Sequence, residues 1–155
     1  MVKVFKEFIK NYIKPSPAES GGLSEHSIRI ATAALLVEMM RTDGNVSDDE
    51  QASVERIIKT KFGLAEEETK ALLRLAEDKL WKATGHYEFT SLINKECTYV
   101  QKVKIIEHLW EVALSDKKLD KYEEHMVRKI SDLIYVSHSD FIQTKLKVRK
   151  EKNAG

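Results

Sequence analysis

The sequence has little cysteine, proline or glycine: one Cys, two Pro and six Gly in 155 residues. The single thiol, Cys97, excludes an intrachain disulfide and leaves no second cysteine for a CxxC redox or zinc pair. No apolar run approaches the roughly 20 residues that a membrane-crossing helix needs. Lysines interrupt the N-terminal segment where a signal peptide would need an apolar stretch. We therefore expect a protein of the reducing cytoplasm.

The sequence also lacks a charge excess of either sign. It has 26 Lys and Arg against 25 Asp and Glu, a net charge of +1. Nucleic-acid binding is therefore not indicated, because neutralising phosphates requires basic residues clustered on one face. Charged residues at 33% against hydrophobic residues at 42% are typical of a soluble helical protein. A chain of this length can bury a core in one domain without disulfides.

Apolar residues recur at helical spacing along most of the chain, and no sustained alternating strand pattern occurs. Capping residues and glycines punctuate this pattern at intervals typical of helix ends. The sequence predicts an all-α fold, a compact bundle of about seven or eight helices. The expected helices cover residues 2–13, 24–42, 47–62, 65–83, 89–94, 98–114, 120–134 and a last segment that begins at a Ser139 cap.

The two ends of the chain are expected to lie outside the main domain. Residues 1–14 form a basic amphipathic helix in this prediction, either docked on the core or lying in a membrane surface as an anchor. Residues 15–23 contain two prolines and a glycine pair and read as a flexible linker. The helical domain then covers residues 24–148, and residues 149–155 are expected to be a disordered tail.

A nine-residue acidic stretch occurs twice. It reads Thr-Asp-Gly-Asn-Val-Ser-Asp-Asp-Glu from Thr42 and returns in degraded form from Ser115 as Ser-Asp-Lys-Lys-Leu-Asp-Lys-Tyr-Glu. A shift of 73 residues aligns the copies, and each joins two predicted helices. The sequence therefore predicts two pseudo-symmetric helix-loop-helix halves. The same shift pairs three acids of the first copy with three of the second, namely Glu38, Asp43 and Glu50 with Glu111, Asp116 and Glu123.

These six acids are the candidate metal ligands. Carboxylates near a helix C-terminus face the negative end of the helix dipole and repel one another, so their concentration favours a bound cation. Oxygen-only ligand sets select hard ions such as Ca²⁺, Mg²⁺ or Mn²⁺. An EF-hand is excluded, because its first and third ligand positions would be Met39 and Arg41.

A reading without metal explains most of the same acids. Glu50 and Glu123 can each be the third residue of a helix capping pair, and Asp43 and Asp116 can be turn residues that bond nearby amides. Only the recurrence of Glu38 as Glu111 is left without a capping role. Both readings stay open on the sequence.

Several motifs of the chain resemble the TerB-like family, the helical domain named for bacterial tellurite-resistance proteins. The motifs are the two acidic stretches, Leu-Ile-Asn from Leu92, Leu-Trp-Glu-Val-Ala from Leu109, and Tyr-Val-Ser-His-Ser-Asp-Phe from Tyr135. The resemblance covers roughly residues 25 to 148. It is strongest to uncharacterised stand-alone members, which are similar to TerB in fold but need not share its role.

The resemblance implies a bundle whose two halves pack about a pseudo-twofold axis, in a bacterial stress-response or membrane-associated scaffolding setting. It also implies divalent-cation binding by the six motif acids. The second copy departs from the family pattern, because Lys117 replaces a glycine and further lysines follow it. We therefore expect one cation site, in the first copy, with lysine acting as the built-in cation of the second.

Two functions follow from the sequence. The first is a non-enzymatic, tellurite-resistance-related module that binds a divalent cation. The alternative is a metal-free adaptor for protein partners or for the inner-membrane surface, attached through residues 1–14. An enzyme, for instance a metal-dependent hydrolase, lacks an identified nucleophile or base, and Cys97 is expected to be an inert buried thiol.

Overall fold

The computed structural model describes residues 3–17, 22–42, 48–83, 87–114 and 121–154. In these ranges the regular elements are helices, and the expected all-α class is confirmed. The helices are α1 (Lys3–Tyr12), α2 (Glu25–Thr42), α3 (Asp48–Thr60), α4 (Glu66–Glu77), α5 (Lys79–Ala83), α6 (Glu88–Glu96), α7 (Tyr99–Ala113), α8 (Lys121–Leu133) and α9 (His138–Ala154). No helix among the described residues is long and apolar enough to cross a bilayer.

One expected helix, over residues 65–83, is two helices in the structure. The backbone of Asp78 is extended, with φ −68° and ψ 122°, and this ends α4. The Asp78 carboxylate then accepts a hydrogen bond from the Trp81 amide at 2.9 Å, so it caps α5. The break turns the face of α5, which leaves Trp81 fully buried but Leu80 72% exposed. The apolar pattern of residues 65–83 predicts that both side chains face inward, and for Leu80 that prediction is wrong.

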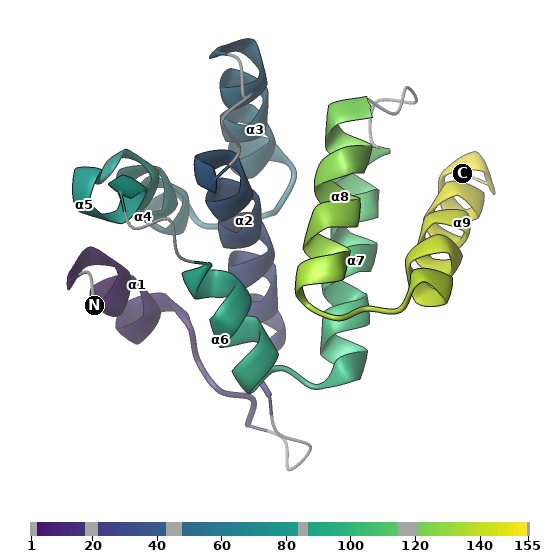
Figure 1. The fold of residues 1–155 in the computed structure, drawn as a ribbon, viewed down its shortest axis with the longest axis horizontal. Coiled ribbons are helices and arrows are strands. Elements are labelled where there is room, and N and C mark those ends of the chain that lie inside the picture. The colour runs from purple at the N-terminus through teal and green to yellow at the C-terminus, as the bar shows by residue number, and fades with distance from the viewer. Residues whose placement is uncertain (1–2, 18–21, 43–47, 84–86, 115–120, 155) are drawn as a thin grey trace.

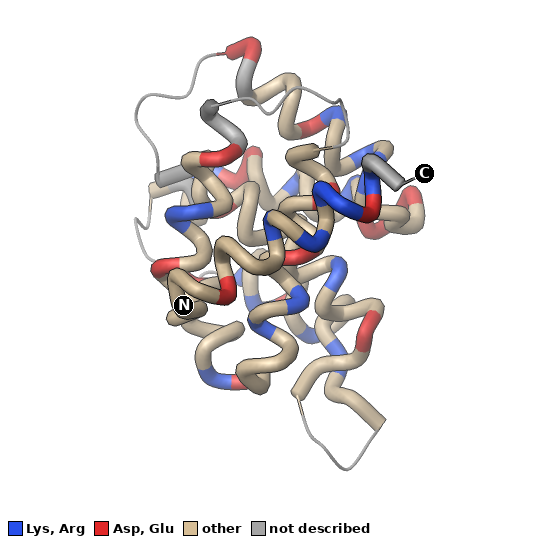
Figure 2. The backbone as a smooth tube through the Cα atoms, turned by 90° about the vertical axis from the view of Figure 1, so that its right-hand side faces the viewer, with Lys and Arg blue, Asp and Glu red and all other residues tan. Residues whose placement is uncertain are grey.

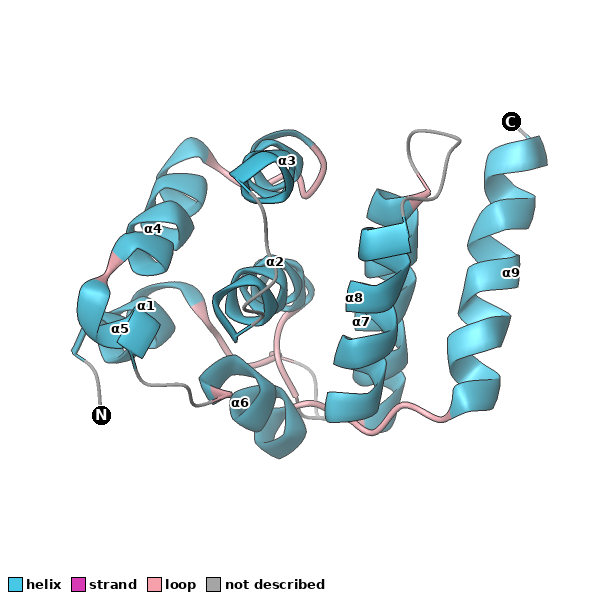
Figure 3. Cartoon of the chain, turned by 45° about the horizontal axis from the view of Figure 1, so that its top comes forward, coloured by secondary structure: helices cyan, strands magenta, loops and turns pink. Residues whose placement is uncertain are grey.

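Helix α2 runs through the middle of the molecule. Figure 1 and Figure 3 show α1, α4 and α5 on one side of it and α7, α8 and α9 on the other, with α6 crossing beside it. Residues 30–39 of α2 are all buried, and every side chain of this segment except that of Glu38 is apolar or small. Ala31, Ala33 and Ala34 keep the helix thin enough for neighbours to approach from several directions. The other helices are therefore arranged around α2.

The N-terminal helix α1 is docked on the core. Its Phe5 and Phe8 are buried and meet the ring of Phe89 in α6 edge-on, with ring centroids 4.9 and 5.7 Å apart. The chain after α1 is also fixed, since the Lys14 amide donates to Ser27 Oγ at 2.7 Å. The docked alternative for residues 1–14 therefore describes the structure.

The segment expected as a flexible linker, residues 15–23, is paired at both of its described ends. Pro15 and Leu23 form an antiparallel bridge, and the Ser16 amide donates to the Gly22 carbonyl at 2.8 Å. Residues 18–21 lie outside the described ranges. Backbone pairing, which composition does not reveal, is the reason that these ends differ from a random linker.

The helix bounds follow the sequence repeat. Shifting α3, residues 48–60, by 73 gives 121–133, which are the bounds of α8. The same shift places the bounds of α2 within two residues of those of α7. Applied to α4, it gives residues 139–150, which all belong to α9. The repeat seen in the acidic stretches therefore extends to three successive helices in each half.

The last helix differs in two ways from the sequence prediction. Its cap is Ser137 and not Ser139, because Ser137 Oγ accepts a hydrogen bond from the Asp140 amide at 3.1 Å. The helix also continues through residues 149–154, where a disordered tail was expected. Buried Val148 and the ion pair of Lys147 with Glu107 on α7, at 3.2 Å, hold this end of α9 against the bundle.

The junction between α8 and α9 contains a strained residue. Tyr135 has φ 61°, a left-handed conformation that is unfavourable for a residue with a Cβ, and the residue is 74% exposed. The corresponding turn after α3 uses Gly63, with φ 63°, where no such strain arises.

Replacing Tyr135 with glycine is expected to stabilise the fold by about 1 kcal/mol, because glycine adopts this conformation without steric penalty. Urea denaturation of Tyr135→Gly measures the gain. Tyr135→Ala is the control, since it removes the exposed ring but keeps a Cβ at the same φ. If the glycine variant is no more stable than the alanine variant, the backbone at this position is not strained.

Candidate functional site

Glu38, the first candidate ligand, lies in the interior of the molecule. Its side chain has no solvent exposure, and its two carboxylate oxygens accept hydrogen bonds from the Phe89 amide at 2.7 Å and from the Thr90 amide at 3.0 Å. Thr90 Oγ1 donates a third bond at 2.9 Å. Phe89 and Thr90 are in the first turn of α6, where amides lack helical partners and the helix dipole favours a negative charge.

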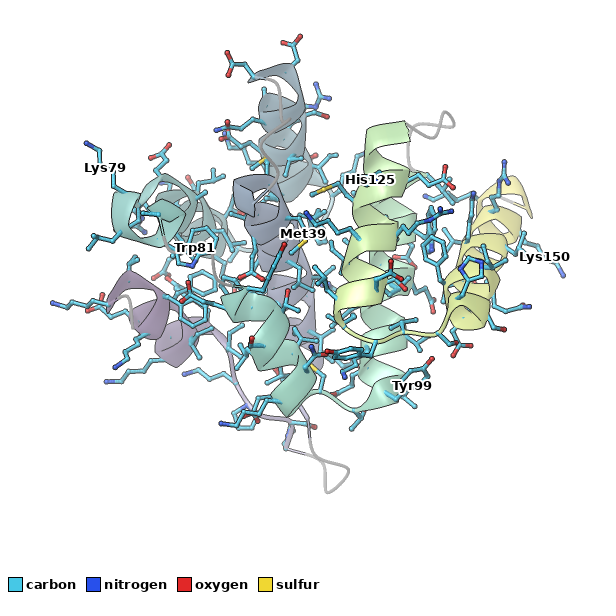
Figure 4. The ribbon with its side chains drawn as sticks, in the orientation of Figure 1. Met39, Lys79, Trp81, Tyr99, His125 and Lys150 are labelled. Carbon is cyan, nitrogen blue, oxygen red and sulfur yellow. The ribbon has the colours of Figure 1, made fainter. Side chains whose placement is uncertain are left out.

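The carboxylate of Glu38 therefore serves as the N-terminal cap of a helix 50 residues further along the chain. Tyr87, the residue at the N-cap position of α6, makes no side-chain capping hydrogen bond. Glu38 supplies this acceptor from another helix. Figure 4 shows the surroundings: Met39 and Trp81 lie in the interior near α6, whereas Lys79 and Lys150 extend outward from opposite sides.

The side chains of four other candidate ligands lie outside the described structure. Asp43 and Asp116 lie outside the described residues, and so do the side chains of Glu50 and Glu123, although their backbones belong to α3 and α8. The capping pair expected for Glu50 also includes Ser47, which is outside the described ranges. At the start of α3 the side chains of Asp48 and Asp49 are exposed.

Glu111, the repeat partner of Glu38, is in a different environment. Its side chain is 46% exposed, and it faces His108 Nδ1 at 3.6 Å. One carboxylate oxygen of Glu111 also lies within 4.8 Å of one from Glu107 and one from Glu151, so three acids from α7 and α9 come together. Glu107 already pairs with Lys147 at 3.2 Å. Exposed acidic groups commonly gather in this way without an ion.

The sequence repeat identifies Glu111 but not Glu107 and Glu151. The spacing of Glu107 and Glu111, one helical turn apart on α7, was the available signal for that pair. Glu151 could not be found in the same way, because it was assigned to a disordered tail and not to a helix beside α7.

Two residues of the motifs that resemble the TerB-like family have structural roles. Asn94 Nδ2 donates to the carbonyl of Leu133 at the end of α8, at 3.0 Å. The indole N–H of Trp110 donates to the carbonyl of Phe141 in α9, at 3.3 Å, and the two rings pack with centroids 5.2 Å apart. These motif residues fix contacts between helices and contribute no reactive group.

Cys97 fits the expectation of an inert thiol. It follows α6 and is partly buried, and burial raises the pKa of the thiol to about 11, with a smaller lowering effect from Lys102. The reactive form of cysteine is the thiolate, which is scarce at neutral pH when the pKa is so high. We therefore assign Cys97 no catalytic role.

Replacing Glu38 with alanine is expected to destabilise the fold by about 3 kcal/mol, because two buried amides and a hydroxyl would lose a charged acceptor. Urea denaturation measures the loss, and faster hydrogen exchange at the Phe89 and Thr90 amides locates it. Glu111→Ala is the matched control at the repeat position, and it should change stability by less than about 0.5 kcal/mol. Equal losses in the two variants would mean that capping of α6 is not the role of Glu38.

Comparisons with known proteins agree with this arrangement. Searches of the curated proteins and of the solved structures gave no match to this chain. The model of one protein family, described as tellurite resistance protein TerB, matches residues 29–146. That range is more than half of the chain and runs from α2 into α9, so it includes both acidic stretches and both motif residues that join helices. The protein therefore belongs to the TerB family.

Proposed function

We propose that this protein is a non-enzymatic module of a stress response related to tellurite resistance, and that it binds one hard divalent cation through its first acidic loop. The family description supports the tellurite-related role. The acid content of residues 43–50 supports the cation: this stretch, which follows α2 and includes the first three residues of α3, contains four carboxylates and no base. Ca²⁺, Mg²⁺ and Mn²⁺ are the ions that such an oxygen-only set selects.

The proposed ligands are Asp43 and Glu50. Glu38 is left out of the set, because its carboxylate is buried and already accepts three hydrogen bonds at the start of α6. The exposed side chains of Asp48 and Asp49 add negative charge at the entrance to α3. That charge favours the ion at long range and stabilises the N-terminal end of the helix.

Calorimetric titration of metal-stripped protein with each of the three ions should reveal one site. Asp43→Asn is expected to abolish binding, because it removes a charged ligand, while Asp116→Asn should leave ion affinity nearly unchanged. The second loop differs because three lysines offset its acids, and about 4 kcal/mol of attraction per close pair lets an ammonium replace the ion.

The outcomes separate the parts of this proposal. Absence of heat with all three ions at millimolar concentration would remove the cation. Equal loss of binding in Asp43→Asn and Asp116→Asn would mean that the two loops share one site. Growth of a tellurite-sensitive host tests the stress role: the wild-type chain should protect it, and Asp43→Asn should not.

A second proposal, a metal-free adaptor at an anionic surface, is favoured by the outward face of α1. Lys3, Lys6 and Lys10 are exposed, whereas Phe5 and Phe8 are buried in the core. Contact with a membrane would therefore be electrostatic and would not require the apolar face of α1 to insert. A lysine near an anionic lipid surface contributes about 1 kcal/mol.

Changing Lys3, Lys6 and Lys10 together to glutamine is expected to abolish association with phosphatidylserine vesicles, with no loss of stability because these side chains are exposed. Vesicle sedimentation measures the association. A matched triple variant, Lys59→Gln with Lys95→Gln and Lys150→Gln, removes the same charge from exposed positions elsewhere. If both triple variants bind as the wild type does, or lose binding equally, α1 is not the contact surface.

A further inference from the structure

A surface hollow of about 490 Å³ lies where α2, the turn between α3 and α4, α7 and α9 come together. Three cationic side chains line it: Arg29 from α2, Lys61 from the turn, and Lys152 from the last turn of α9. Each comes from a different element, so only the folded chain brings them to one place. The volume is within the range of small-molecule sites, roughly 300 to 1,000 Å³.

Within the described part of the chain, no carboxylate forms an ion pair with these three cations. Other basic residues form ion pairs, for example Lys145 with Glu124 at 2.9 Å and Lys70 with Glu66 at 3.1 Å. Among the described residues, Arg29, Lys61 and Lys152 form none. Like charges gathered at one surface repel one another, and an anion between them relieves that repulsion.

Helix dipoles account for only part of this arrangement. Lys61 directly follows α3 and Lys152 is near the end of α9, positions where a cation is stabilised by the negative end of a helix. Arg29 is in the second turn of α2, near the positive end, where the dipole does not favour a cation. Its guanidinium lies over Gly63, with Nη1 3.7 Å from where a Cβ of that residue would be.

The lining of the hollow also includes one acid. Glu111 lines it together with His108, and the two side chains lie 3.6 Å apart. With histidine neutral, the lining has three positive charges and one negative charge. An arginine fork beside two lysines matches a group that has several oxygens and about two charges.

We propose that this hollow binds a small molecule that carries a phosphoryl group. The phosphoryl oxygens contact Arg29, Lys61 and Lys152, and the rest of the ligand occupies the space toward His108. This inference goes beyond the proposed function and does not depend on it, since it involves neither Asp43 nor Glu50. Glu111 lines the same hollow, and its carboxylate opposes a bound anion there.

Calorimetric titration of metal-free protein with inorganic pyrophosphate at low ionic strength tests the proposal. Arg29→Gln is expected to weaken binding at least tenfold, and Lys61→Gln and Lys152→Gln several-fold each. Glu111→Gln should strengthen binding a few-fold, because it removes the repelling carboxylate. Lys95→Gln, an exposed lysine of α6 outside the hollow, is the matched control and should bind as the wild type does.

Three results would overturn the proposal: no pyrophosphate binding at millimolar concentration, equal weakening in Lys95→Gln and Arg29→Gln, or weaker binding in Glu111→Gln. The second of these would mean general attraction to a basic surface. Because the protein is metal-free in this experiment, failure here leaves the cation proposal untouched, and failure of the cation titration leaves this one untouched.

Discussion

A buried carboxylate is the constraint on which much of this fold depends. A charge without solvent is tolerated only when hydrogen bonds satisfy it, and Glu38 obtains them from the first turn of α6. This requirement sets where α6 begins and how it lies against α2. Helix α6 in turn presents Phe89 to the aromatic rings of α1 and Asn94 to the end of α8. One acid of the central helix thereby positions elements on both sides of the molecule.

The two halves share their helix register but not their chemistry. Glu38 and Glu111 are 73 residues apart and occupy equivalent positions on α2 and α7, yet one is buried under α6 and the other borders a basic hollow. Gly63 and Tyr135 show the same divergence at the turns that follow α3 and α8. The repeat therefore conserves the packing arrangement, while the polar groups of each half have separate roles. Figure 2 shows Lys and Arg interspersed with Asp and Glu along the backbone.

Local patterns in the sequence were sufficient for most of the fold. Apolar spacing located α2, α3, α7 and α8, and the repeat related them, because these signals lie within a few turns of helix. The start of α7 was predicted from Thr98, which forms a capping box with Gln101. The break at Asp78 was missed, because its extended backbone interrupts an apolar pattern that continues across it.

The candidate site was less predictable, since its contacts join distant parts of the chain. The sequence identified Glu38 as unusual but could not show that its partners are amides more than 50 residues away. In the same way, Arg29 and Lys152 are 123 positions apart and meet only because α2 and α9 both border α7. Helix periodicity carries no information about contacts between residues so far apart in the sequence. These contacts depend on how the helices pack.

The cap on α6 also has a consequence for a chain emerging from the ribosome. Helices α1 to α5 are complete by residue 83, but the Glu38 acceptor in the second half of α2 meets its donors only when residues 89 and 90 have been synthesised. Until then the carboxylate must keep its hydration, and α2 cannot close fully against its neighbours. We therefore expect the first half of the chain to remain loosely packed during translation. The two halves have similar helix bounds, yet the first half cannot complete its packing until α6 has been synthesised.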